Sequence, residues 1–159
     1  MKLSVLAVGR IRESFFRDAV SEYTKRIGRY AKIEIREIPD EPVPERLSAA
    51  QIRQCKEKEG RRILEKQNAS AYRIALCIDG TRMDSKAFSA RLEEIMSRGI
   101  SRIEFIIGGS NGLSDEVIES ADLKLSFSDM TFPHQLMRVI LLEQIYRAFK
   151  IMNHEPYHK

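Results

Sequence analysis

Five short segments with strand patterns alternate with five segments of helical spacing, and no other feature of the chain constrains its fold as much. The strand segments lie at 3–8, 33–38, 72–79, 102–109 and 123–128, and at 33–38 apolar and charged residues alternate as in a half-exposed strand. The helical segments lie at 14–30, 48–67, 85–98 and 114–120, with a last one of about 18 residues after Pro133. Because a helix between two strands carries the chain back across the sheet, this order predicts an α/β fold with a mostly parallel sheet and helices on both faces.

Length and composition favour one soluble domain. A chain of 159 residues forms a single core by the usual size range, and the proline-rich loop after 38 is too short to separate two domains. We therefore treat 1–159 as a single domain. The apolar runs are too short to cross a bilayer and the N-terminus lacks a signal peptide, so we expect no membrane partner and a cytoplasmic location. The net charge of +4 is compatible with a nucleic-acid partner but is only a weak signal for one.

The first place where chemistry could occur is "FIIGGSNGLSDE", at 105–116. Glycines at 108, 109 and 112 follow an apolar strand and precede a helix that Ser114 is expected to cap. Glycine permits close backbone approach to a ligand, and the free amides of a helix start favour anionic groups. The spacing is neither the dinucleotide fingerprint nor a P-loop. Two interpretations are open: a simple tight turn or a ligand-binding loop.

The second place is "LSFSDMTFPHQ", at 125–135. A loop that follows a parallel strand lies at the carboxyl edge of the sheet, where open α/β folds bind their ligands. Its hydroxyls and apolar side chains suit a ligand with a flat heterocycle and a polar tail. The alternative is a loop leading into the last helix, in which Thr131 or a neighbour caps the helix and the phenylalanines enter the core.

The last helix, "HQLMRVILLEQIYRAFKIM", carries apolar residues on more than one stripe, whereas an ordinary surface helix has a single apolar face. We expect one side to pack on the sheet of the same chain and the other on a partner, which predicts a homodimer through this helix. Arg138, Glu143, Gln144 and Arg147 are left for polar contacts at the interface or the site.

The chain ends in "NHEPYHK", which contains the H-E-x-x-H spacing of zinc proteases. Pro156 disfavours the helix that such a site needs, and Lys159 leaves no downstream segment for a third ligand. We therefore predict no metal site. The tail is either a frayed end or a strap packed on the domain, and Tyr157 favours the strap because an aromatic ring is rarely left in solvent.

These segments resemble one family. "FIIGGSNGL", the run "LSFSDMTFPHQLMRVILLEQIYRAFKI" and "PYHK", with "LAVGR", "IPDE" and "KEKEGRRIL" earlier in the chain, are similar to the RlmH (YbeA-like) family of SPOUT-class methyltransferases. The resemblance implies a C-terminal trefoil (α/β) knot, although general rules favour an unknotted sheet. It also implies a homodimer and an enzyme that uses S-adenosylmethionine to methylate N3 of a pseudouridine in the 23S rRNA of the assembled ribosome.

The position of the tail motivates a mechanistic hypothesis, because the tail leaves the buried helix whose start lies next to the cofactor loop. We hypothesise that His158, with Tyr157, closes over the substrate base and that Arg138 contributes charge near the site or at the dimer interface. His134 is a weaker candidate for the base. Two rival functions remain: an RNA- or ribosome-binding dimer without catalysis, and a nucleotide-binding enzyme that uses the glycine loop.

The cofactor contacts that the resemblance implies are Leu76, Gly108, Phe127, Ser128, Asp129, Met130, Thr131 and Phe132.

Overall fold

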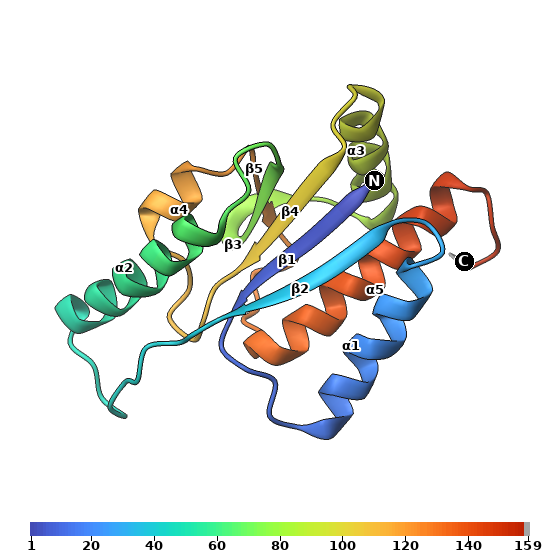
Figure 1. Ribbon diagram of the computed structural model, residues 1–159. Helices are drawn as coiled ribbons and strands as arrows, with labels where there is room; N and C mark the ends of the chain where they lie inside the picture. The colour runs from blue at the N-terminus through green and yellow to red at the C-terminus, as the bar shows by residue number, and fades with distance from the viewer. Residues whose placement is uncertain (158–159) are drawn as a thin grey trace.

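The structure, a computed structural model, describes residues 1–157. Within that range the chain forms the alternating elements that the sequence predicts (Figure 1). The strands are β1 (Lys2–Val8), β2 (Lys32–Ile38), β3 (Tyr72–Arg82), β4 (Arg102–Ile107) and β5 (Leu123–Ser126). The helices are α1 (Ser14–Ile27), α2 (Ala49–Lys66), α3 (Ser85–Ser97), α4 (Asp115–Glu119) and α5 (His134–Met152).

The strands form one sheet in the order β2-β1-β4-β3-β5, and every pairing is parallel. The predicted fold class is thus confirmed as far as the parallel sheet and its helices are concerned. In a parallel sheet all carboxyl ends lie at one edge, so the loops after β3, β4 and β5 meet there although they are far apart in sequence.

Helices cover both faces of the sheet (Figure 1). On one face α5 lies between α1 and α3, and their apolar side chains pack on alternate residues of β1 and β4, such as Val5 and Phe105. On the other face α2 and α4 pack on the intervening residues, such as Leu6 and Ile106, through Ile63 and Val117. The alternation of strand side chains thus divides the apolar core into two clusters.

Element ends differ from the sequence predictions in one informative place. We expected the third strand to end at Asp79-Gly80, but β3 continues to Arg82. Leu76 and Thr81 both pair with Leu125, so the residues between them bulge out of the ladder. A Cβ at Gly80 would lie 2.7 Å from the backbone of Leu125. Only a residue without a Cβ therefore permits this close approach. The glycine therefore marks a bulge in the strand and does not end it.

The predicted cap of the fourth helix is confirmed. Ser114 is the N-cap of α4, and its Oγ accepts a hydrogen bond from the Val117 N–H at 3.4 Å. Asp115 and Glu116 occupy the first turn, where their charge suits the helix dipole. This cap fixes the end of the glycine-containing loop that follows β4.

Candidate functional site

A cavity of about 810 Å³ opens at the carboxyl edge of the sheet. It lies between the loop after β4, the loop after β5 and the bulged part of β3, so both loops singled out in the sequence face the same space. Its volume is in the range of small-molecule and cofactor sites. The lining residues are Lys56, Leu76, Cys77, Ile78, Ile107, Gly108, Gly109, Ser110, Asn111, Gly112, Leu113, Ile118, Leu125, Phe127, Ser128, Met130, Thr131, Phe132, Pro133, His134 and Met137.

The loop after β4 is a tight turn that also forms a wall of the cavity, so the two interpretations of its glycines are compatible. The Gly112 N–H donates to the Gly109 carbonyl at 3.0 Å, and Gly112 has a φ of 84°. A Cβ at Gly108 would lie 2.7 Å from the backbone of Gly112, so only glycine lets the two arms approach this closely. At the three glycines the turn presents only backbone to the cavity, next to Ser110, Asn111 and Leu113 in the same wall.

Helix α2 supports this loop from behind. A Cβ at Gly60 would lie 2.3 Å from Ser114 Oγ, so α2 and the start of α4 are in direct contact there. Next to it Glu59 is only 4% exposed, and its Oε1 accepts from the Glu41 N–H at 2.9 Å. Its Oε2 is buried without a hydrogen-bond partner among the described residues, on the side of Gly109. Burial raises the pKa of this carboxyl group.

The sequence analysis did not predict that α2 supports the glycine loop. Glu59 and Gly60 lie in a strongly charged helix, where a glutamate is normally solvated, and nothing in the spacing marks one of them as buried. The available signal was the glycine inside a helix, which usually has a packing or functional reason.

The loop after β5 lines the cavity through a mixture of aromatic, thioether and hydroxyl groups. Ser128 Oγ accepts from the Met130 N–H at 3.0 Å, which holds the loop in a turn, and Met130 is 73% exposed. No side chain caps α5, whose N-cap is Pro133, so the expectation that Thr131 or a neighbour caps this helix is wrong. Phe127 does pack against the core, as the alternative interpretation expected.

The expected cofactor residues fall almost entirely around this cavity. Asp129 is the exception: it forms an ion pair with Arg82 and does not line the cavity. That these residues bind a cofactor stays a prediction. Those that line the cavity are Leu76, Gly108, Phe127, Ser128, Met130, Thr131 and Phe132.

Arg138 lies behind the cavity wall and is 0% exposed. Its Nη1 donates to Glu37 Oε1 at 2.9 Å, and its Nη2 donates to the carbonyls of Val8 and Gly9 at 3.1 and 2.6 Å. These bonds fasten the start of α5 to the end of β1. The buried guanidinium therefore reaches neither the cavity nor the protein surface within one chain.

His134, one turn before Arg138, does line the cavity. Burial lowers the pKa of this imidazole, and the nearby Arg138 charge lowers it further. The side chain is therefore neutral at neutral pH and able to accept a proton.

The tail is a strap as far as the structure describes it, and His158 lies outside the described residues. The Tyr30 hydroxyl donates to Glu155 at 2.7 Å, and Lys150 forms an ion pair with Glu155 at 2.5 Å. The Tyr157 hydroxyl donates to Glu143 Oε1 at 3.1 Å. Residue 143 is nine positions after His134, so along a helix this contact lies roughly 13 Å from the cavity end of α5. Tyr157 thus does not line the cavity of its own chain.

The Tyr157 ring is also enclosed by α5. Its edge meets Tyr146, with 5.0 Å between ring centroids, and the Arg147 guanidinium lies 4.7 Å from its centroid. Burial and the Glu143 carboxylate raise the pKa of Tyr157 to about 12. The phenol is therefore neutral in any physiological range.

In residues 1–157, no group of three or more His, Cys, Asp or Glu side chains is arranged to hold a metal ion. The second histidine of the H-E-x-x-H spacing, His158, is not among them. No helix of this part of the chain combines the length and apolarity that a membrane crossing requires.

Comparisons with known proteins agree with the geometry. Residues 1–158 match the family described as "Predicted SPOUT methyltransferase". A relative named ribosomal RNA large subunit methyltransferase H, from Bifidobacterium animalis subsp. lactis (strain AD011), is 50% identical over 159 residues, which cover 100% of both chains.

Two solved structures share the fold. A probable methylase family protein from Haemophilus influenzae Rd KW20 superposes with a TM-score of 0.55 at 10% identity, over 99% of this chain and 70% of that one. The putative methyltransferase Lpg2936 from Legionella pneumophila, in complex with the bound cofactor SAM, gives a TM-score of 0.51 at 12% identity, over 93% of this chain and 66% of that one.

Proposed function

This chain belongs to the SPOUT methyltransferase family, and we propose that it transfers a methyl group from S-adenosylmethionine to N3 of a pseudouridine in the 23S rRNA of the assembled ribosome. The observation that carries the proposal is the cavity at the carboxyl edge of the sheet, which both the glycine loop and the loop after β5 line. The identity of 50% over the full chain to a large-subunit rRNA methyltransferase supports the substrate class. An enzyme that acts on ribosomes is expected in the cytoplasm.

The lining of the cavity fits the proposed cofactor. Phe127, Phe132 and Leu76 offer flat and apolar surfaces for an adenine ring, while the Ser128 and Thr131 hydroxyls and the glycine backbone offer polar groups for the ribose and amino-acid portions. The bound SAM named for the Legionella neighbour supports the same cofactor type. S-adenosylmethionine supplies a methyl group already activated on a sulfonium, so the reaction needs no metal.

The protein must then orient the pseudouridine and accept the proton of N3. That proton lies between two carbonyl groups, so modest assistance suffices near neutral pH. His134 lines the cavity as a neutral imidazole and is one candidate acceptor. His158 in the tail is the other, with Tyr157 closing over the base as a neutral phenol. In its own chain Tyr157 contacts the far part of α5.

We therefore place the tail across a homodimer formed through α5. Leu136, Val139 and Ile140 are only partly buried in a single chain, which leaves an apolar strip on the outer side of this helix. Covering that strip with a second α5 would bring the tail of one protomer toward the cavity of the other. Sedimentation should give a dimer at micromolar concentration, and a monomer would contradict this arrangement.

Mixed dimers test the contribution across the interface. A protomer with Gly108→Ala has an intact tail and a damaged cavity, because the new Cβ would meet the Gly112 backbone at 2.7 Å. A protomer that lacks residues 156–159 has an intact cavity but no tail. If the tail acts across the dimer, refolding the two together restores methyl transfer at one site, whereas a tail that acts within its own chain leaves every mixed site inactive. Circular dichroism of each parent is the control for folding.

The family also supports a C-terminal trefoil knot. After the edge strand β5 the chain continues into α5, which packs between α1 and α3 on one face of the sheet. This path is compatible with the chain passing through a loop.

Mass spectrometry of the 23S rRNA is the decisive test of function. Ribosomes that lack the modification are incubated with the protein and S-adenosylmethionine, and the fragment that carries the pseudouridine should gain the mass of one methyl group. No gain, together with no calorimetric binding of S-adenosylmethionine, would favour an RNA-binding dimer without catalysis.

A further inference from the structure

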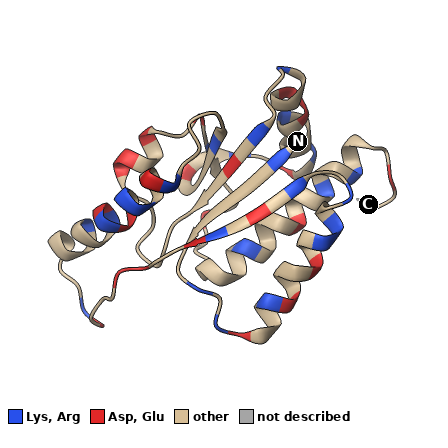
Figure 2. Cartoon of the chain, viewed as in Figure 1, with Lys and Arg blue, Asp and Glu red and all other residues tan. Residues whose placement is uncertain are grey.

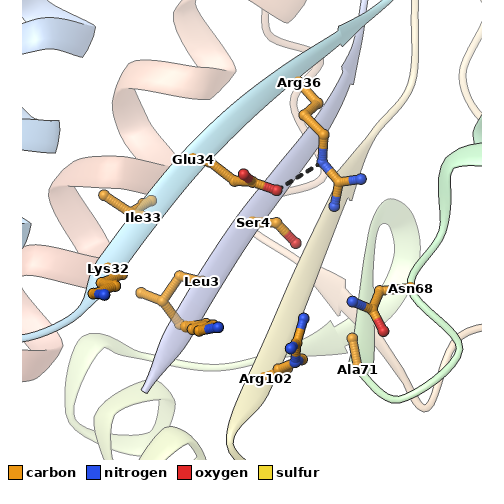
Figure 3. A pocket seen from close by; sticks show the side chains of 10 residues that line it. Leu3, Ser4, Lys32, Ile33, Glu34, Arg36, Asn68, Ala71 and Arg102 are labelled. Atoms are coloured by element: carbon orange, nitrogen blue, oxygen red, sulfur yellow. Dashed lines mark ion pairs between the residues drawn. The ribbon is translucent and has the colours of Figure 1, made fainter.

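One face of the sheet is open at its amino edge, opposite the cofactor cavity. Helices α2 and α4 cover only the carboxyl half of this face, where Leu6, Val8 and Ile106 are buried. The amino half forms a pocket of about 360 Å³ between β1, β2, β4 and the turn after α2 (Figure 3). Nothing in the proposed reaction uses it.

Three cations form a row across this pocket. Lys2 is in register with Lys32 on β2 and with Arg102 on β4, and all three side chains belong to the same face of the sheet. Figure 2 shows the corresponding blue ends of the three strands. Adjacent strands are about 4.8 Å apart, and like charges side by side on a sheet are destabilising. We call this set the cationic row.

The carboxylates of the pocket do not neutralise the row. Glu104 is 0% exposed and accepts from Ser4 Oγ at 3.0 Å, Arg36 Nη2 at 2.9 Å and the Asn68 N–H at 3.1 Å. Glu34 lies 3.0 Å from Arg36 Nε. Figure 3 shows Arg36 and Arg102 on either side of Ser4. Both carboxylates therefore pair with Arg36.

No ion pair within residues 1–157 involves the three members of the row. Lys2 and Lys32 are also exposed, and Arg102 is partly so. A row of like charges without local partners costs stability, and an anion bound from outside would offset that cost.

We infer that the cationic row binds phosphate groups of the rRNA backbone, at a docking contact separate from the target base. The inference rests on the proposed function for the nature of the polyanion. Lysine and arginine are the usual partners of phosphate oxygens, and such contacts position a protein without reading sequence. Along β1 the row lies roughly 20 Å from the cavity, so it holds RNA that takes no part in methyl transfer. The face is also turned away from α5, so the proposed dimer leaves it open.

The test compares two triple variants of equal charge. The row variant carries Lys2→Gln, Lys32→Gln and Arg102→Gln. The control carries Lys25→Gln, Lys86→Gln and Arg98→Gln, which are exposed positions on the opposite layer. Binding of each protein to ribosomes and to protein-free 23S rRNA is measured over a range of salt concentrations, and calorimetry gives the affinity for S-adenosylmethionine.

The row variant should bind both RNAs at least about 10-fold more weakly at low salt, and its slope of log K against log salt should be shallower by roughly 2 to 3. Its affinity for S-adenosylmethionine should equal that of the wild type. Unchanged RNA binding, an equal loss in the control, or a loss with an unchanged salt slope would each overturn the inference. An effect on ribosomes that is absent on protein-free rRNA would also overturn it, because it would indicate a ribosomal protein as the partner. Binding is measured without methyl transfer, so failure of the proposed reaction would be seen separately.

Discussion

Replacing Gly60 by alanine is expected to displace the glycine loop from its support on α2. The new Cβ would lie 2.3 Å from Ser114 Oγ, 3.0 Å from Ser114 Cβ and 3.4 Å from Val117 Cγ2. Carbon atoms in good contact are about 3.5 to 4 Å apart, so Ser114 must move. Ser114 is buried and caps α4, so its movement takes the start of that helix and the preceding loop with it.

The cost follows from three terms. Overpacking of this kind costs roughly 1 to 3 kcal/mol. Loss of the serine cap costs about 1 kcal/mol. The better helix propensity of alanine returns about 1 kcal/mol. We therefore expect Gly60→Ala to lower the free energy of unfolding by roughly 1 to 3 kcal/mol in urea titrations followed by circular dichroism. Because the loop lines the cavity, calorimetry should also give an affinity for S-adenosylmethionine about 10-fold weaker.

Ser114→Gly supplies the matched background, since it removes the atoms that the new Cβ would meet. There the alanine substitution should cost little or even stabilise the protein by about 1 kcal/mol, through helix propensity alone. The reasoning is refuted if Gly60→Ala costs the same in both backgrounds, or if it leaves the stability and the cofactor affinity of the wild type unchanged.

Three further predictions concern polar groups that are buried or partly buried. The raised pKa of Glu59 means that the folded chain holds this proton more tightly than the unfolded chain, so its contribution to stability is lost as pH rises through the raised value. Glu59→Gln should remove that dependence and stabilise the protein by about 1 kcal/mol at neutral pH; parallel pH profiles from urea titrations of the two proteins would contradict this. Arg138→Met removes the hydrogen bonds to Glu37 and to two backbone carbonyls and should cost roughly 2 kcal/mol in the same assay, whereas wild-type stability would show that these bonds are not needed. Tyr157→Phe should leave the pH profile of methyl transfer unchanged near neutrality, because the phenol has a pKa of about 12; a shifted profile would mean that Tyr157 titrates during the reaction.

Local patterns predicted most of the secondary structure because they depend on neighbours in sequence. Alternating apolar runs and helix-length segments place the five strands and five helices of residues 1–157, and Ser114 caps α4 as its position before Asp115 and Glu116 indicates. The predictions failed where a segment distant in sequence determines the local conformation. Gly80 looks like the end of a strand, yet β3 continues because the glycine permits close approach to Leu125 on β5.

In the candidate site, too, local sequence predicted some features and distant segments determined others. The composition of the two loops and the resemblance together indicated the residues that line the cavity, since parallel strands bring their following loops to one edge. The orientation of single side chains within those loops was not predictable. Asp129 turns to Arg82 outside the cavity, and Glu59 is buried beneath the glycine loop although its helix reads as solvated.

Periodicity and motifs are properties of short segments, so the chain alone predicted the α/β class, the parallel sheet, the family and the two candidate loops. The burial of Arg138 against the end of β1, the contact of Tyr157 with the far part of its own helix, and the row of Lys2, Lys32 and Arg102 came only from the folded structure. Burial and strand register depend on which distant segments pack together, and no short segment contains that information.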